Sequence, residues 1–239
     1  MNTEISRPPT LSQIVSSKLR EEILKGVMQP GQQLSEPELS ARYGVSRGTI
    51  REGLRAATAD GLVEILPHRG ARVVSLTPKL VHETYSLRRQ LERFAVQEAW
   101  KAGAYDNQFL TSLEAQLACM QEAQNSGIVH DQIVADYDFH WSLCSASGHS
   151  LLLKALQEPQ WLTRLCMISL KHLVPDLPAD AQRHFPILEG LRVDLDKALS
   201  ALEQHLQETE HLLLESVDAL TEGDLAPPLQ RDTSPDQKT

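Results

Sequence analysis

Residues 44–61 read Gly-Val-Ser-Arg-Gly-Thr-Ile-Arg-Glu-Gly-Leu-Arg-Ala-Ala-Thr-Ala-Asp-Gly, and this stretch decides the fold of the first third of the chain. Gly44 suits the left-handed residue that ends a helix, and Ser46 is a good N-cap for the next helix. Ile50 and Leu54 recur at helical spacing and give the second helix an apolar inward face. The stretch therefore predicts a helix, a tight turn and a second helix.

Polar residues gather at the start of this second helix, away from its apolar face. Arg47, Thr49 and Arg51 lie within its first turns. In a helix-turn-helix, the N-terminal residues of the second helix reach base edges in the major groove, and the planar fork of arginine suits guanine or phosphate. Two arginines there oppose the helix dipole, so stability does not explain them. An ordinary solvated amphipathic helix is the alternative, and the flanking segments distinguish the two.

The flanking segments complete a larger unit. Residues 34–43 predict the first helix of the pair, with Pro37 in its first turn, where a missing N–H is tolerated. Residues 61–66 and 71–74 predict two short strands around a tight turn. A helix pair followed by a hairpin is typical of a winged helix.

Residues 11–75 resemble, without a gap, the N-terminal domain of the GntR family of bacterial transcription regulators. The motifs that carry the resemblance include Pro30-Gly31, Gly44-Val45-Ser46-Arg47, Arg51-Glu52, Gly61-Leu62-Val63 and Arg69-Gly70. The resemblance implies a winged helix-turn-helix that binds a double-stranded DNA operator. The positions it implies for DNA contact are Ser46, Arg47, Thr49, Arg51, His68 and Gly70. Pro37 departs from the family, because many members have a contacting arginine there.

The charge is divided unevenly along the chain. The net charge of −9 argues at first against DNA binding. Residues 1–74, however, carry 10 Lys and Arg against 8 Asp and Glu, whereas residues 75–239 carry 13 against 24. A mildly basic first domain on an acidic body suits a regulator whose body must not adhere to DNA.

Composition and length indicate two domains in a mainly α protein. A chain of 239 residues with 41% hydrophobic and 5% aromatic residues favours aliphatic helical packing. Three scattered cysteines fit a reducing compartment, and the polar N-terminus lacks a leader, so we expect a cytoplasmic protein without membrane contact. The expected divisions are an N-terminal arm at 1–10, a winged helix-turn-helix at 11–75, an all-α bundle at 76–222 and a disordered tail at 223–239.

Helical periodicity continues through residues 77–221, without convincing strand alternation. Thr77 and Pro78 predict a capped helix start, and Pro159 predicts a break. The helices expected in this region are 78–102, 107–125, 129–145, 150–158, 162–172, 179–193 and 195–220.

One helix of the expected bundle brings a carboxylate and an imidazole onto one face. Asp136 and His140 are one turn apart, a common way to supply two ligands to a metal. His184 and His205 stand on later helices, so all four residues could surround a divalent ion. The alternative is that these histidines are core residues with ordinary hydrogen-bonded partners.

The region 86–213 resembles the all-helical FCD ligand-binding domain of the FadR subfamily of these regulators. The segments that carry it are Arg88-x-x-Leu91-Glu92, Asp136 to His140, His184 to Leu191 and Ala198 to His205. The resemblance implies that Asp136, His140, His184 and His205 bind a divalent metal, zinc or nickel, in an effector pocket. It also implies that Arg88 reaches a carboxylate of the effector.

The resulting hypothesis is a homodimeric, metabolite-responsive transcription repressor whose bundle binds a small carboxylic acid through the metal, and which is not an enzyme. Two alternatives remain. The first is a metal-dependent, hydrolase-like enzyme with a DNA-binding head, for which Glu189 is the candidate general base. The second is a constitutive repressor in which the metal is structural.

Overall fold

The computed structural model describes residues 8–67, 69–170 and 180–222, with side chains to residue 218. Four expectations fall wholly or partly outside them: the arm at 1–7, the wing-tip residue His68, the end of the helix expected at 162–172, and the tail at 223–239.

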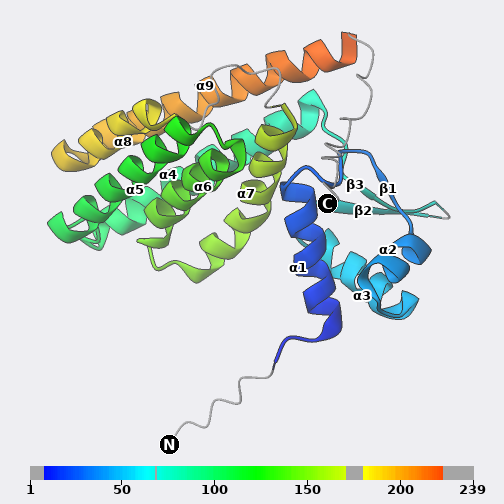
Figure 1. Cartoon of the computed structure of the whole chain (residues 1–239). Helices are drawn as coiled ribbons and strands as arrows, with labels where there is room; N and C mark the ends of the chain where they lie inside the picture. The colour runs from blue at the N-terminus through cyan, green and yellow to red at the C-terminus, as the bar shows by residue number, and fades with distance from the viewer. Residues whose placement is uncertain (1–7, 68, 171–179, 223–239) are drawn as a thin grey trace, which may run out of the picture.

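The first part of the chain, which we call the head, contains three helices and three strands within the described residues (Figure 1). They are α1 (Leu11–Leu24), β1 (Gln33–Leu34), α2 (Glu36–Tyr43), α3 (Arg47–Thr58), β2 (Val63–Leu66) and β3 (Gly70–Val73). The rest, which we call the bundle, is helical throughout the part that is described. Its helices are α4 (Pro78–Lys101), α5 (Asn107–Ser126), α6 (Val129–Ser145), α7 (Ser150–Leu170), α8 (Ala181–Val193) and α9 (Leu195–Glu222). The mainly α fold class expected from the sequence is confirmed.

The helix pair of the head forms as its end residues dictate. Gly44 follows α2 with a left-handed φ of 68°, and the Ser46 side chain accepts a hydrogen bond from the Thr49 N–H. A Cβ added at Gly53 would lie 2.4 Å from a methyl carbon of Val15, so α3 packs on α1 at backbone distance. The recognition helix is therefore held by the closest contact in the head's core.

The wing is a three-stranded antiparallel sheet with the order β1-β3-β2. The hairpin of β2 and β3 is confirmed, with Val63 opposite Val73 and Leu66 opposite Gly70. β1 is a correction, because Leu34 was assigned to the start of a helix. It pairs with Ala71 of β3, and the helix begins only at Glu36.

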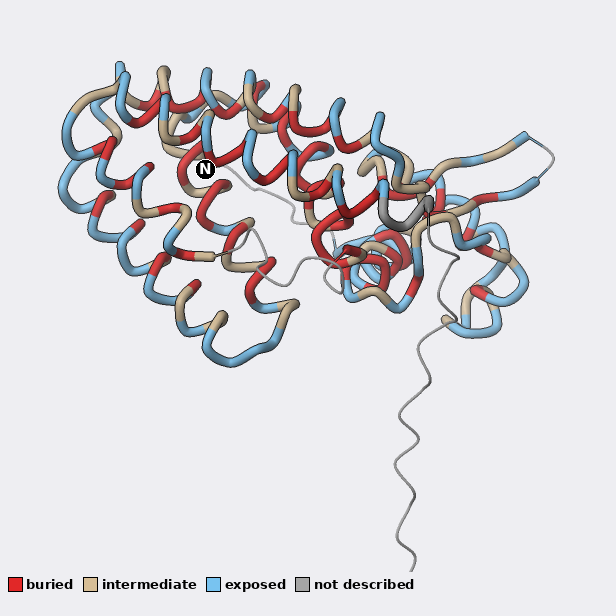
Figure 2. The backbone as a smooth tube through the Cα atoms, turned by 90° about the horizontal axis from the view of Figure 1, so that it is seen from above, coloured by how far each residue is buried: buried red, intermediate tan, exposed pale blue. Residues whose placement is uncertain are grey.

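The bundle packs its helices with their apolar faces inward (Figure 2). Tyr85, Leu113, Phe139 and Leu188 are among the fully or almost fully buried residues of its core. A Cβ at Gly190 would approach the Ala198 backbone to 2.6 Å, so α8 and α9 lie in close contact. This contact fixes the spacing of the two helices that carry His184 and His205.

The break expected at Pro159 is wrong, since α7 continues through it. Proline removes one backbone donor and crowds the preceding turn, which costs about 3 kcal/mol in a helix interior. Leu156 and Leu162, on either side, are buried in apolar clusters or beside them. The burial of both flanks offsets that cost, and the sequence alone does not reveal it.

Head and bundle meet along α1 and α7 as well as through the short connection before α4. Leu165 of α7 belongs to the apolar core of the head, and Trp161 packs against that core. The start of α4 is as expected, because the Thr77 side chain accepts a hydrogen bond from the Leu80 N–H and Pro78 is the first residue. Among the described residues, no helix has the length and apolar character needed to cross a membrane.

Candidate metal centre and nucleic-acid interface

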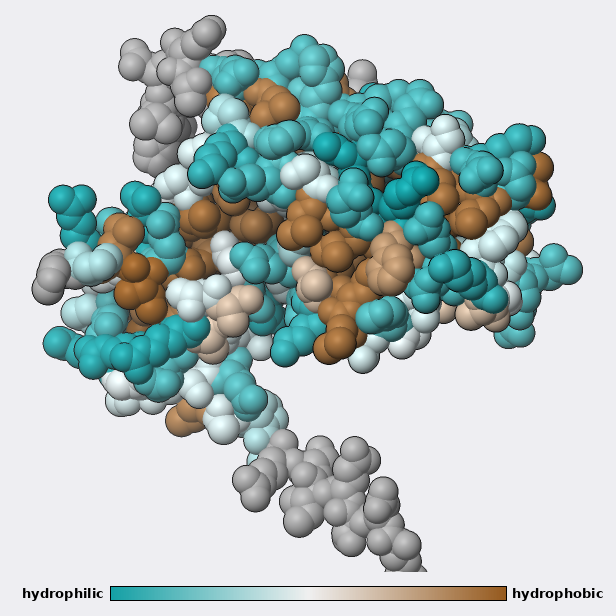
Figure 3. Space-filling view, turned by 180° about the vertical axis from the view of Figure 1, so that it is seen from behind, coloured by the Kyte–Doolittle hydropathy of each residue, from teal (hydrophilic) through white to brown (hydrophobic). Residues whose placement is uncertain are grey.

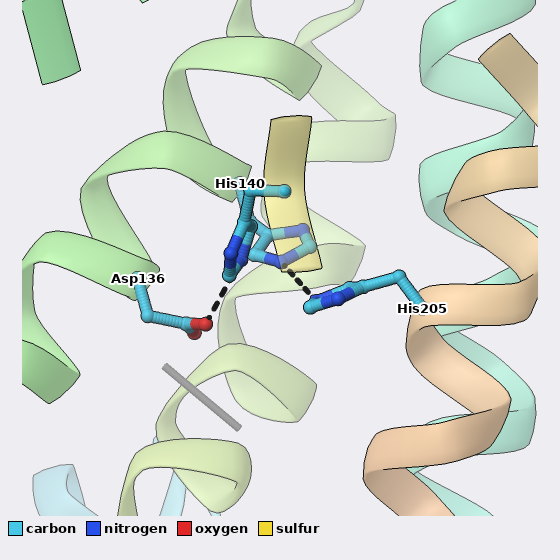
Figure 4. A group of neighbouring side chains, drawn as sticks. Asp136, His140 and His205 are labelled. Carbon is cyan, nitrogen blue, oxygen red and sulfur yellow. Dashed lines mark hydrogen bonds and ion pairs between the residues drawn. The ribbon is translucent and has the colours of Figure 1, made fainter. Parts of the chain in front are cut away.

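The four residues expected to bind a metal lie together in the interior of the bundle. Asp136 and His140 come from α6, His184 from α8 and His205 from α9. All four are buried, and one ligand atom from each lies within 4.8 Å of the others. Figure 4 shows Asp136 and His140 projecting from one helix toward His205 on another. Four donor atoms at such distances match the first coordination shell of a single ion.

The donor atoms face one another without forming a normal hydrogen-bonded network. Nε2 of His140 lies 3.2 Å from Nε2 of His205, and Nε2 of His184 lies 3.1 Å from Oδ1 of Asp136. The second contact is close but not aligned as a hydrogen bond, so both atoms remain unpaired. Buried polar atoms are costly when unpaired. A divalent cation would satisfy both of them, and the site therefore fits a metal.

Hydrogen bonds behind two of the rings select the nitrogen that is free to bind. Nδ1 of His140 donates to Oε2 of Glu92 at 2.8 Å, because an ionised carboxylate only accepts. Nδ1 of His184 donates to the backbone carbonyl of Asp180 at 2.9 Å. Nε2 of each ring therefore carries a lone pair directed to the shared centre. Such partners fix the tautomer and orientation of metal-binding histidines.

The electrostatics of the cluster favour a cation. Burial raises the pKa of Asp136, but its contact with His184 and the nearby positive charges of His140 and Arg88 bring it below its ordinary value. Burial, together with the neighbouring imidazoles, holds the pKa of His205 well below its usual range. The carboxylate is thus ionised and the imidazole neutral, which are the forms that bind a metal.

Arg88 is almost fully buried, with 1% of its surface exposed, and lies beside this cluster. Its Nε donates to Oε1 of Glu92 at 2.6 Å, and one of its terminal nitrogens donates to the Thr163 hydroxyl at 3.1 Å. Its other terminal nitrogen, Nη2, has no partner. Arg88, Glu92 and His140 therefore form a continuous chain that ends at the metal cluster.

The sequence reading did not assign a role to Glu92 or Thr163. The available signal was the i, i+4 spacing of Arg88 and Glu92, which places the two side chains on one helix face. Thr163 comes from α7, 75 residues further along the chain, so only the fold brings it to the arginine.

The residues expected to contact DNA lie at the start of α3 and at the wing. Arg47, Arg51 and Gly70 line one groove of about 430 Å³ between them. The hydroxyls of Ser46 and Thr49 are 2.9 Å apart, and that of Ser46 also caps α3. His68 is outside the described residues, so the sixth position stays a prediction.

The two arginines of this groove differ in their partners. Arg51 makes a two-pronged ion pair with Glu36, with nitrogen–oxygen distances of 3.0 and 2.8 Å. Arg47 is exposed and has no ion pair among the residues that are described. Arg47 is thus the more available cation, whereas Arg51 must exchange one anion for another on binding DNA.

Comparison with known proteins supports the same division of the chain. A family model described as bacterial regulatory proteins, gntR family, matches residues 11–73, and a model of the FCD domain matches residues 83–208. An uncharacterized HTH-type transcriptional regulator of Bacillus subtilis, YdhC, is 33% identical over 64% of this chain and 67% of its own. A probable D-xylose utilization operon transcriptional repressor of Paenarthrobacter nicotinovorans is 30% identical over 80% of this chain and 85% of its own.

The structural comparison agrees with the fold. The solved structure of E. coli McbR/YncC superposes with a TM-score of 0.73 and 20% identity, covering 87% of this chain and 99% of that one.

Proposed function

Since the chain belongs to the gntR family of bacterial regulatory proteins, which are DNA-binding transcription regulators, we propose that it is a repressor controlled by a small carboxylic acid. The acid binds in the bundle through a divalent metal, zinc or nickel, held by Asp136, His140, His184 and His205. Several relatives that carry the name repressor support the direction of control, among them the gluconate operon repressor of Bacillus licheniformis.

The observation that carries the proposal is the set of unpaired buried atoms in the bundle. Asp136 Oδ1 and His184 Nε2 face each other with no hydrogen bond, in a centre closed off from solvent. Four protein ligands leave one or two positions of an octahedral ion open. When bound, the metal supplies a Lewis-acid partner for a carboxylate oxygen.

Arg88 supplies the second contact to the acid in this proposal. Its Nη2 is buried and unpaired, while its other nitrogens hold Glu92 and Thr163 in place. A carboxylate bound to the metal retains lone pairs that a guanidinium N–H satisfies well. The arginine is already fixed by its neighbours, so little side-chain entropy is lost when the acid binds.

We propose that the protein acts as a homodimer on a pseudo-palindromic operator, as helix-turn-helix dimers do. The face of the bundle seen in Figure 3 gathers apolar side chains. Leu87 and Phe94 of α4 and Leu151 of α7 are 48%, 41% and 73% exposed. Because α4 and α7 pack against each other, these side chains offer a second copy an apolar surface. Light scattering of Leu151→Glu, beside the wild type, tests this surface.

The enzyme alternative loses its candidate base. Glu189 is exposed on α8 and lies 3.8 Å from Arg192, so its carboxylate is outside the buried centre. The structural-metal alternative is separated by experiment. Metal-loaded protein is bound to a DNA site selected from a random duplex pool and then titrated with a panel of small carboxylic acids. Release by one acid, lost in Asp136→Asn, supports the proposal. Unchanged binding with every acid favours a structural metal.

A further inference from the structure

A second polar cavity lies where the head meets the bundle, apart from the metal cluster. Its walls come from α1 on one side and from α6 and α7 on the other, and it encloses about 260 Å³. Arg20 and Lys25 line it from the head, and His130, Trp161 and Arg164 line it from the bundle. We call it the head–bundle cleft. None of the four metal-cluster residues lines it.

Arg164 is the feature of this cleft that the proposed function does not use. Its guanidinium lies over the rings of Tyr137 and Trp161, at 4.9 and 5.1 Å from their centroids. Its Nε is buried and has no hydrogen-bond partner. Within the described part of the chain no carboxylate forms an ion pair with it, and Asp138 acts on it only at longer range.

The other two cations of the cleft are already paired. Arg20 grips Asp60 with nitrogen–oxygen distances of 3.0 and 2.6 Å, and Lys25 pairs with Glu21 at 2.6 Å. Arg164 is therefore the one whose positive charge still lacks a direct counter-ion among the described residues. Leaving a buried charge without a partner is costly, so a site of this kind favours an anion.

A second unpaired donor stands next to it. The indole Nε1 of Trp161 is buried and has no hydrogen-bond partner. The indole N–H and the guanidinium Nε–H can only donate. Two donors and an uncompensated positive charge, lining one cavity, are complementary to an oxygen anion with several lone pairs.

We propose that the head–bundle cleft binds a small oxyanion, a carboxylate or a phosphate, through Arg164 and Trp161. Because a water molecule occupies about 30 Å³ of liquid, a cavity of 260 Å³ holds an anion of several heavy atoms with accompanying water. The anion contacts α7 on the bundle side and lies against Arg20 and Lys25 of α1. It therefore ties the head to the bundle and provides a second input besides the metal centre.

The position of α7 gives this input a physical route to both ends of the protein. Leu165 packs in the core of the head, and Thr163 accepts a hydrogen bond from Arg88 beside the metal cluster. Arg164 lies between these two residues in the sequence. An anion at Arg164 thus acts on the helix that both the head and the metal centre contact.

The test follows the indole N–H of Trp161 by NMR. The chain has three tryptophans, and Trp161→Phe identifies the resonance. Inorganic phosphate and acetate are titrated separately at constant ionic strength, with chloride as the balancing anion. We expect a saturable shift of the Trp161 resonance with at least one of them. Phosphate alone or acetate alone identifies which oxyanion the cleft prefers.

Three variants make the result specific. Arg164→Gln should weaken the anion at least about tenfold, since a hydrogen bond to a charged group contributes that much or more. Arg164→Lys should retain part of the affinity, and Arg192→Gln, an exposed arginine of α8, should bind as the wild type does. Metal content, measured on every variant, should stay unchanged. No saturable shift in the wild type, or an equal shift in Arg164→Gln, overturns the proposal without affecting the metal centre.

Discussion

The carboxylate of Glu92 joins two functional side chains: one oxygen accepts a hydrogen bond from Nδ1 of His140 at 2.8 Å, and the other accepts one from Nε of Arg88 at 2.6 Å. All three residues are buried. Burial raises the pKa of Glu92, but the positive charges of Arg88 and His140 bring it below its ordinary value. A single ionised carboxylate thus orients the proposed metal ligand and the proposed effector contact together.

Glu92→Gln should weaken metal binding by about 10–100-fold without removing a ligand, because the carboxylate partner of a metal-binding histidine fixes its orientation and raises its basicity. Competition with a coloured chelator measures the dissociation constant. Glu189→Gln is the matched control, since that carboxylate is exposed on α8. A dissociation constant in Glu92→Gln equal to that of the wild type would contradict a role for Glu92 in positioning His140.

Arg88→Ala should lower the free energy of unfolding by about 3–5 kcal/mol, because it leaves the Glu92 carboxylate buried beside an empty space. The double variant Arg88→Met with Glu92→Gln should recover much of that loss, since both buried charges are then gone. Urea unfolding followed by circular dichroism measures both. If the single and double variants are equally stable, the Arg88–Glu92 pair does not carry the energy assigned to it.

Gly53→Ala should destabilise the head by about 1–3 kcal/mol, because the new methyl group would lie 2.4 Å from a carbon of Val15 and would push α3 away from α1. Gly48→Ala is the control within the same helix. Its Cβ would have no neighbour closer than 3.7 Å, and alanine favours a helix over glycine by about 1 kcal/mol. Thermal melting should separate the two variants in opposite directions, and equal midpoints would refute the close packing of α3.

Arg47→Ala should weaken binding to the selected DNA site by about 1–3 kcal/mol, and Arg51→Ala should cost less. The difference arises because Arg51 is paired with Glu36 in the free protein, whereas Arg47 is exposed without an ion pair in the described region. Fluorescence anisotropy at several salt concentrations measures the affinity and its salt dependence. Arg192→Ala controls for the loss of a surface charge. An Arg47→Ala variant that binds as tightly as Arg192→Ala would exclude Arg47 from the interface.

What the sequence predicts correctly depends on close neighbours in the chain. The left-handed Gly44, the N-caps Ser46 and Thr77, and the shared helix face of Asp136 and His140 are each set within about one helical turn. Family resemblance added His184 and His205, which come from other helices, and the fold brings all four together.

What the sequence does not predict depends on packing between distant segments. β1 exists only because Leu34 finds Ala71 on β3. Pro159 stays inside α7 because both flanks are buried. The unpaired Arg164 likewise results from how α7 meets the head, and no local pattern reports which charges find partners across an interface.

The metal content of the purified protein tests the central claim most directly. Elemental analysis is performed on the wild type, on His184→Ala and on His211→Ala, in which an exposed histidine of α9 is replaced. The account predicts close to one divalent ion per chain in the wild type and in His211→Ala, and almost none in His184→Ala. The thermal midpoint of His184→Ala should also fall, because a metal bound only to the folded state stabilises it. Equal metal content in all three proteins would contradict the proposed centre.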